Sequence, residues 1–266
     1  MDRRTIPAID MHSHYNHGSR QDTRTSEIYR ADLDYLKQMN QAANIAITFY
    51  SSFAAVLSPE SVVEENEHAF ALAQQLDWVY QWVVVDPRQE ETIRQARQML
   101  PDRKCIGIKI HPLSHGYSIF DHADRLFALA AEYQAVVLMH PETPAGMPAL
   151  TDRYPTMKLI IAHLGSTGHV EAIRNSRWGN IYVDTSGEAS KNNRIIEYAV
   201  EQAGSDHILF GTDTYAAAFQ RGRIEYALID EEAKLNILCR NAQSLFGDKL
   251  SQASEQSDQQ PGGGRA

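Results

Sequence analysis

Eight short apolar segments recur along the chain, and their spacing constrains the fold more than any other feature. Each is rich in isoleucine and valine, is bounded by polar residues, glycine or proline, and starts 22 to 38 residues after the previous one. They occupy residues 6–12, 44–50, 78–86, 105–111, 135–140, 158–163, 180–186 and 207–213. Most lack a strict alternation of apolar and polar residues, which is typical of strands buried on both faces of a parallel sheet.

Amphipathic helical patterns fill most of the gaps between these segments. They cover residues 27–43, 61–76, 88–100, 121–133 and 192–204, and the last ends at Gly204, a residue type that commonly terminates helices. Alternating strands and helices indicate the α/β class. Eight such units in a chain of 266 residues match the size of a (β/α)8 TIM barrel. An open doubly wound sheet is the alternative, but no glycine-rich phosphate turn follows an early strand.

The expected organisation is a single barrel domain over residues 1–250, with its strands and helices between residues 6 and 247. Residues 251–266 contain no large apolar side chain. Such a segment cannot bury enough surface to offset the entropy lost on ordering, so we expect a disordered C-terminal tail.

The charge balance narrows the class of partners. Lys and Arg number 25 against 34 Asp and Glu, a formal charge of -9 without a basic run, which disfavours nucleic acid and anionic lipid. No segment approaches the roughly 18 apolar residues of a membrane span, and no secretory signal is apparent. Cys105 and Cys239 lie in apolar surroundings and are expected to be buried thiols. We therefore expect a cytoplasmic protein that acts on a small molecule, with homo-oligomerisation left open.

Side chains that bind metals stand at the ends of these apolar segments. They are His12, His14, His111, His140, His163 and Asp213. In a (β/α)8 barrel the carboxyl ends of the strands meet at the mouth, where active sites form. His12 and His14 are two residues apart, so both imidazoles can reach one ion from the same strand face. Together with His140 and Asp213 they would suit Zn²⁺ with one position open, and Mn²⁺, Fe²⁺ or Co²⁺ could use the same donors.

Each of these residues also has a simpler explanation. A histidine before proline, as at His111 and His140, commonly marks a strand that enters a turn. Asp213 could cap the following helix. The recurrence of such residues at the same end of several strands favours the metal site.

Several motifs resemble those of the amidohydrolase superfamily. They are DMHSH (10–14), GIKIHP (107–112), HP (140–141), AHLG (162–165), FGTD (210–213) and NAQSLFG (241–247). The chain is most similar to the amidohydrolase-related branch, which also contains zinc decarboxylases. The resemblance implies that His12, His14, His140 and Asp213 bind one divalent metal ion. It also implies that Asp213 accepts a proton from water and that His163 orients water or polarises the substrate.

A second set of residues is expected to contact the substrate. It comprises Lys109, His111, His115 and Tyr117. Two-metal members of the superfamily carry a carboxylated lysine on the fourth strand, so Lys109 could bridge two ions, although one ion is favoured. In a one-ion site Lys109 would form a buried ion pair or bind a substrate carboxylate. Asp10 is expected to support a ligand imidazole, and Tyr15 and His17 could also contact the substrate.

Three functions remain open. The preferred hypothesis is hydrolysis of a small amide, lactone or ester by a metal-activated water. The alternative is non-oxidative decarboxylation of a small carboxylic acid, in which Arg221 or Arg223 could bind the carboxylate in a bidentate manner. The third is a barrel without enzymatic activity. A serine hydrolase is disfavoured because the sequence lacks the GxSxG motif.

Overall fold

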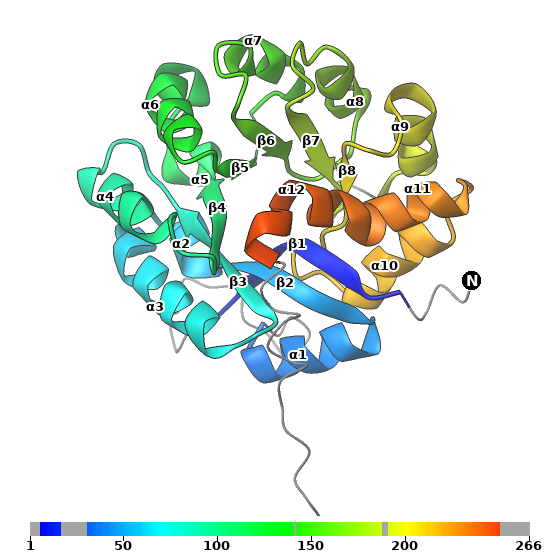
Figure 1. Cartoon of the computed structure of the whole chain (residues 1–266), viewed down its shortest axis with the longest axis horizontal. Helices are drawn as coiled ribbons and strands as arrows, with labels where there is room; N and C mark the ends of the chain where they lie inside the picture. The colour runs from blue at the N-terminus through cyan, green and yellow to red at the C-terminus, as the bar shows by residue number, and fades with distance from the viewer. Residues whose placement is uncertain (1–5, 17–30, 141, 188–190, 251–266) are drawn as a thin grey trace, which may run out of the picture.

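Eight parallel strands form the centre of the molecule. The computed structural model describes residues 6–16, 31–140, 142–187 and 191–250, so the expected tail 251–266 and His17 lie outside the described residues. Every strand pairs in parallel with the next one along the chain, in the order β1 to β8. The strands are β1 (Ala8–Tyr15), β2 (Ile45–Ser52), β3 (Val79–Val84), β4 (Cys105–Ile110), β5 (Val136–Met139), β6 (Lys158–Ile161), β7 (Ile181–Asp184) and β8 (Ile208–Leu209). The eight predicted segments are thus confirmed as strands of a nearly closed (β/α)8 TIM barrel (Figure 1).

The barrel closes through a seam between β1 and the residues that follow β8. Met11 N–H donates to the Phe210 carbonyl at 3.0 Å, and the His12 carbonyl accepts from Thr212 N–H and Asp213 N–H at 3.2 and 2.7 Å. Strand β1 carries a bulge between Asp10 and Ser13. Asp10 pairs with Thr48 of β2 and Ser13 pairs with Tyr50, so three steps along β1 correspond to two along β2. The bulge inserts one extra residue and changes which side chains of β1 face the interior.

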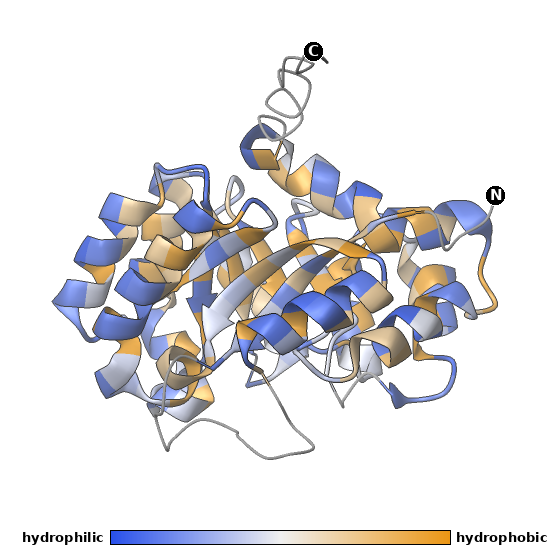
Figure 2. Ribbon diagram, turned by 90° about the horizontal axis from the view of Figure 1, so that it is seen from below, coloured by the Kyte–Doolittle hydropathy of each residue, from blue (hydrophilic) through white to orange (hydrophobic). Residues whose placement is uncertain are grey.

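Helices surround the strands (Figure 1). The five predicted helices are α1 (Leu33–Ala42), α3 (Val62–Gln75), α4 (Glu90–Met99), α6 (Ile119–Glu132) and α9 (Ile195–Ala203), and α9 is followed by Gly204 at φ +74°. Others were not predicted: α2 (Phe53–Leu57), α5 (Pro112–His115), α7 (Met147–Thr151), α8 (Thr167–Arg174), α10 (Ala217–Glu225), α11 (Glu231–Leu235) and α12 (Asn241–Leu250), with short η2 (Pro59–Ser61), η3 (Pro144–Gly146) and the π-helical η5 (Asn236–Arg240). Hydrophobic residues gather on the strands and on the helix faces towards them (Figure 2).

Helix α12 covers the amino-terminal end of the barrel. Phe246 enters the apolar interior, with its ring 5.0 Å from that of Phe49 and 5.8 Å from that of Trp82. The Lys249 ammonium donates to the carbonyl of Cys105, the first residue of β4, at 2.5 Å. One end of the barrel is therefore filled by side chains, which leaves the carboxyl ends of the strands for a binding site.

Two further expectations concern buried thiols and membranes. Cys105 and Cys239 are both free and buried, as predicted. Among the described helices, none combines the length and the apolar character needed to cross a lipid bilayer.

Candidate metal centre

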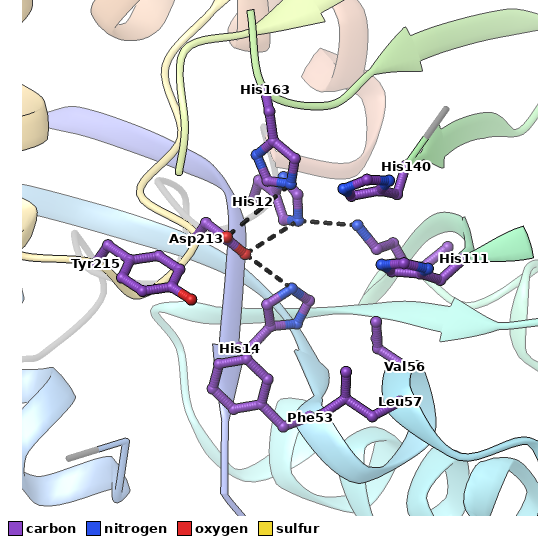
Figure 3. Close-up of a pocket in the computed structure, with 11 residues that line it drawn as sticks. His12, His14, Phe53, Val56, Leu57, His111, His140, His163, Asp213 and Tyr215 are labelled. Atoms are coloured by element: carbon purple, nitrogen blue, oxygen red, sulfur yellow. Dashed lines mark hydrogen bonds and ion pairs between the residues drawn. The ribbon is translucent and has the colours of Figure 1, made fainter. Parts of the chain in front are cut away.

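A pocket of about 280 Å³ opens at the carboxyl ends of the strands (Figure 3). It collects side chains from β1, β4, α2 and the segments that follow β4, β5, β6 and β8. The lining residues are His12, His14, Phe53, Val56, Leu57, Lys109, His111, His140, His163, Asp213 and Tyr215. The six polar residues predicted at the strand ends therefore share one cavity, together with Lys109.

Three of the predicted metal ligands converge on one point of this pocket. Asp213 Oδ1 lies 3.2 Å from His14 Nε2 and 3.6 Å from His12 Nε2. The two imidazole rings meet edge to face at 5.1 Å, which directs both Nε2 atoms towards the carboxylate (Figure 3). Two imidazole nitrogens and one carboxylate oxygen within 4.8 Å of one another are a donor set that fits a divalent ion such as Zn²⁺ or Mn²⁺.

The backbone around Asp213 is strained to bring its carboxylate to the histidines. Asp213 and Thr214 have φ angles of +53° and +63°, in the left-handed region that non-glycine residues seldom occupy. The Thr214 hydroxyl donates to the His14 carbonyl and accepts from His14 N–H, both at 2.7 Å. These bonds fix Asp213 across the seam from β1, a placement that depends on tertiary contacts rather than on local preference.

Asp184 is a site residue that the sequence analysis missed. Its Oδ2 lies 2.9 Å from His12 Nδ1, and its Oδ1 accepts from Ser186 N–H at 2.8 Å. Burial alone would raise the pKa of Asp184, but attraction to His12 and the hydrogen bonds from Ser186 hold that pKa below its usual range. A carboxylate behind a ligand imidazole fixes the ring so that its other nitrogen faces the ion. The signal was present, because Asp184 ends β7 as the predicted residues end their strands.

Asp10 does not take the part predicted for it. Its carboxyl group accepts from Thr212 N–H at 3.0 Å and from the Thr212 hydroxyl at 2.6 Å, and it also accepts from the backbone N–H of His12. The bulge in β1 explains the error, because Asp10 and His12 no longer follow the simple alternation of a regular strand. Asp10 joins the two sides of the seam, and Asp184 supports the imidazole instead.

His163 and His140 line the same pocket and lie near His12 (Figure 3). The His163 ring stacks on that of His12 at 5.0 Å, and its Nε2 is 3.9 Å from Asp213 Oδ2. His163 also forms a second group of close donor atoms with His12 and Asp184. His140 stands 5.1 Å from the His163 ring and belongs to neither group, and its Nδ1 is buried without a hydrogen-bond partner among the described residues.

Lys109 places a buried amine next to the converging ligands. Its Nζ lies 2.8 Å from His12 Nε2, and its side chain is 1% exposed. Burial lowers the pKa of Lys109 to about 8, and Asp213 and Asp184 oppose that fall. The amine therefore stays mostly protonated at pH 7. Burial also lowers the pKa of His12, to about 3, so this imidazole is neutral and can serve as a ligand.

Five other predicted residues lie outside the pocket, and the first is Tyr15, whose ring lies 5.9 Å from that of Tyr50 in a buried cluster. His115 Nε2 donates to the Ala55 carbonyl at 2.9 Å, and Tyr117 lines a separate surface depression. Arg221 is held by the carbonyls of residues 6 and 44 and by Glu225. Arg223 donates to the Thr185 carbonyl at 3.3 Å. The structure therefore gives neither arginine a place against a substrate carboxylate in this pocket.

The apolar wall of the pocket was not predicted either. Helix α2 follows β2 directly and supplies Phe53, Val56 and Leu57, while Tyr215 lines the opposite side after β8 (Figure 3). A five-residue helix leaves little periodic pattern in a sequence, so only the structure assigns it to the site.

A comparison with protein families identifies the chain. The family model described as amidohydrolase matches residues 9–247, from β1 to α12. The chain belongs to the amidohydrolase family. This finding confirms the resemblance seen in the motifs. Among curated proteins, none matches this amidohydrolase.

Solved structures share the barrel fold of this amidohydrolase at low sequence identity. A dihydroxybenzoic acid decarboxylase from Polaromonas sp. JS666, with bound manganese, has 16% identity and a TM-score of 0.70, covering 93% of this chain and 98% of its own. A 5-carboxyvanillate decarboxylase from Novosphingobium aromaticivorans, also with manganese, has 13% identity and a TM-score of 0.71, with 92% and 97% covered. A probable 2-pyrone-4,6-dicarboxylic acid hydrolase from Acinetobacter baumannii has 15% identity and a TM-score of 0.65, with 91% and 100% covered.

Proposed function

We propose that this amidohydrolase is a metal-dependent decarboxylase of a small carboxylic acid. The observation that carries the proposal is the buried Lys109 amine, 2.8 Å from His12 in the group that His12, His14 and Asp213 form. Of the described residues that line the pocket, Lys109 alone is a lysine or an arginine. A protonated amine in a buried cavity favours an anionic substrate group, since it offsets the loss of water around that anion. The two decarboxylases named above support the same reaction class.

The proposed ligand set is His12, His14, His140 and Asp213, for a single divalent ion. Zn²⁺ is the ion expected from the sequence, and Mn²⁺ is an alternative suggested by the relatives. An ion held there would supply a Lewis acid that withdraws electrons from the bound substrate. Asp184 would keep His12 oriented through the bond to its Nδ1.

The roles of the remaining residues follow from the reaction. Decarboxylation converts R–CO2⁻ and a proton into R–H and CO2, so an acid must deliver one proton to the carbon that loses CO2. Lys109 would bind an anionic group of the substrate. Asp213, which is itself one of the converging ligands, and His163 beside it would be the acid and base groups. The apolar wall from α2 would cover the rest of the small substrate and exclude water from it.

Hydrolysis of a small amide, lactone or ester is the second candidate. The specific observation in its favour is the state of Asp213: burial alone would raise its pKa, but His14 and His12 hold that pKa below its usual range. An ionised carboxylate can accept a proton from water, as hydrolysis requires. The probable pyrone hydrolase among the relatives supports this alternative.

The test combines metal analysis with a small substrate panel. The full chain is purified without added metal, its metal content is measured, and Zn²⁺- and Mn²⁺-loaded samples are given 2,6-dihydroxybenzoate, 5-carboxyvanillate and 2-pyrone-4,6-dicarboxylate. CO2 release with loss of the carboxyl group is the expected result. Ring opening of the pyrone without CO2 release would replace the proposal by the second candidate. A protein loaded with metal that turns over none of the acids would contradict it.

The proposed ligands are tested separately from the reaction. Replacing His12 and His14 together with Ala should abolish metal retention, because two neighbouring ligands are lost. Lys109→Met should keep the metal but weaken binding of the acid, seen as a raised KM. Full metal occupancy in the double variant would show that the ion is held by residues other than His12 and His14.

A further inference from the structure

The imidazoles of His12 and His163 are fixed in a common orientation by the hydrogen-bond partners of their Nδ1 atoms. His12 Nδ1 faces the Asp184 carboxylate at 2.9 Å and the Ser186 hydroxyl at 3.0 Å. His163 Nδ1 faces the Ser186 hydroxyl at 3.0 Å and the Ser186 carbonyl at 3.3 Å. The Asp184 carboxylate and the Ser186 carbonyl can only accept, and the Ser186 hydroxyl gives its own proton to Asp184. The rings of His12 and His163 therefore carry their protons on Nδ1. Each therefore presents the lone pair of Nε2 to the pocket.

His111 is fixed in the opposite way. It stands directly before the one-turn helix α5, and its Nδ1 accepts the backbone N–H of Ser114 at 3.2 Å. A backbone amide can only donate, so Nδ1 of His111 bears no proton. The proton of this ring must therefore be on Nε2. His111 carries an N–H group on the nitrogen where His12 and His163 carry a lone pair.

The loop that carries His111 is held rigidly. The Arg88 guanidinium donates to the carbonyl of Gly116 at 3.1 Å and to that of His115, and it also pairs with Asp86. His115 in turn bonds to Ala55 of α2, which ties the loop to the apolar wall of the pocket. The Nε2–H of His111 is thus directed by the fold and does not require a ligand to orient it.

The ring of His111 lies against the metal centre without belonging to it. It stacks on His140 at 4.4 Å with an interplanar angle of 18°, across the pocket from Asp213 and Tyr215 (Figure 3). His111 lines the cavity, and in the described part of the chain no protein group bonds to its Nε2.

We infer that His111 is a substrate-orienting hydrogen-bond donor, which binds an acceptor oxygen of the substrate such as a carboxylate or carbonyl oxygen. It is neither a metal ligand nor a general base, because both roles need a lone pair on the nitrogen that faces the pocket. The inference rests on the proposed function for the identity of the ligand, and it extends that function by assigning a specificity-determining residue. A substrate that offers only a donor at this position would leave the N–H unpaired and would bind poorly.

The first experiment measures the protonation of the ring without any substrate. A long-range ¹H–¹⁵N correlation spectrum of the Zn²⁺-loaded full chain, with His111 assigned by comparison with His111→Asn, reports which ring nitrogen bears the proton. The expected result is Nε2–H for His111 and Nδ1–H for His12. A proton on Nδ1 of His111, or a metal-bound Nε2, would overturn the inference.

The second experiment uses matched variants and 2,6-dihydroxybenzoate as the probe. In His111→Asn the side-chain oxygen can still accept the Ser114 N–H, so the cap is kept while the donor is withdrawn from the pocket. We expect unchanged metal content, a Kd or KM raised about tenfold, the effect of one hydrogen bond to an anion, and an unchanged pH profile. His111→Phe, which keeps a ring against His140, should raise Kd to the same degree.

The control and the contradictory outcomes separate this inference from the proposed function. His122→Phe changes a histidine of α6 that packs against Tyr117 and does not line the pocket, and it should leave metal content and affinity unchanged. Loss of metal in His111→Asn would identify a ligand, and loss of one limb of the pH profile would identify a general base. If wild type turns over none of the panel acids, the proposed function fails, while the spectrum and the metal content still decide the role of His111.

Discussion

His163 and Asp213 are neighbours with different expected roles. Their Nε2 and Oδ2 atoms are 3.9 Å apart, but only Asp213 converges with His12 and His14. His163→Asn should keep most of the metal yet lower kcat by about 10²-fold or more, the usual scale for loss of a positioned catalytic group. Asp213→Asn should reduce both the metal content and kcat, because an amide is a poorer ligand and cannot accept a proton. Steady-state kinetics and metal content measured on the same samples test this difference.

One result would contradict the different roles expected for His163 and Asp213. If His163→Asn loses its metal as completely as the variant that lacks both His12 and His14, then His163 is a ligand and the proposed ion is held by a different set. The second group of donor atoms, which joins His163 to His12 and Asp184, defines where that ion would then lie.

The sequence predicted which residues meet, but not how each is oriented. His12, His14 and Asp213 were predictable because strand ends of a barrel converge whatever their neighbours are. Asp184 also ends its strand, so its place near the site was predictable, but its bond to His12 was not. That bond depends on a bulge that removes Asp10 from the expected face of β1. A bulge arises from pairing with another strand, so two residues that are alike in sequence pattern can exchange roles.

At the level of elements, the strands were predictable and the short helices were not. Parallel strands are buried on both faces and leave continuous apolar runs, whereas α2 and α5 are too short to show a period. The eighth strand is reduced to two residues, because Phe210 N–H donates to the Ile237 carbonyl of η5 instead of continuing a ladder. That contact joins segments distant in sequence, and no local pattern signals it.

Two glycines in the left-handed region offer a matched pair of variants. Gly187 follows β7 at φ +73°, and a Cβ there would lie 2.7 Å from His163 Nδ1 and 3.2 Å from Asp213 Oδ2. Gly204 follows α9 at φ +74°, with nothing within 4 Å of a Cβ. Both Ala variants should lose about 1–2 kcal/mol of stability from backbone strain. Only Gly187→Ala should also lose metal and activity, because its methyl group displaces two site residues.

Chemical denaturation and metal analysis of both glycine variants distinguish strain from displacement. Equal metal content and equal kcat in Gly187→Ala and Gly204→Ala would mean that the loop after β7 accommodates the methyl group, and that Gly187 does not position His163 and Asp213.

On the scale of the whole molecule, stability and chemistry occupy opposite ends of the barrel. Phe246 fills the amino-terminal end against Phe49 and Trp82, at the opposite end of the strands from the candidate metal centre. Phe246→Ala should lower the free energy of unfolding by about 3–5 kcal/mol, as for other buried aromatic residues, with unchanged metal content per folded chain. Urea unfolding followed by circular dichroism measures the first quantity. A loss of metal at equal folded fraction would contradict this separation.

The seam between β1 and the segment after β8 gives the proposed ion a second effect. His14 and Thr214 are 200 residues apart in sequence, and the proposed ligands His14 and Asp213 lie on opposite sides of the seam. An ion bound there would fasten the first strand of the ring to the last. At a free concentration 100 times its Kd it would stabilise the fold by about 2.7 kcal/mol. Chelation should therefore lower the Tm of wild type but not that of the variant lacking His12 and His14. In a cell short of metal, this protein would lose its resistance to proteolysis together with its activity, so its abundance would follow the metal supply.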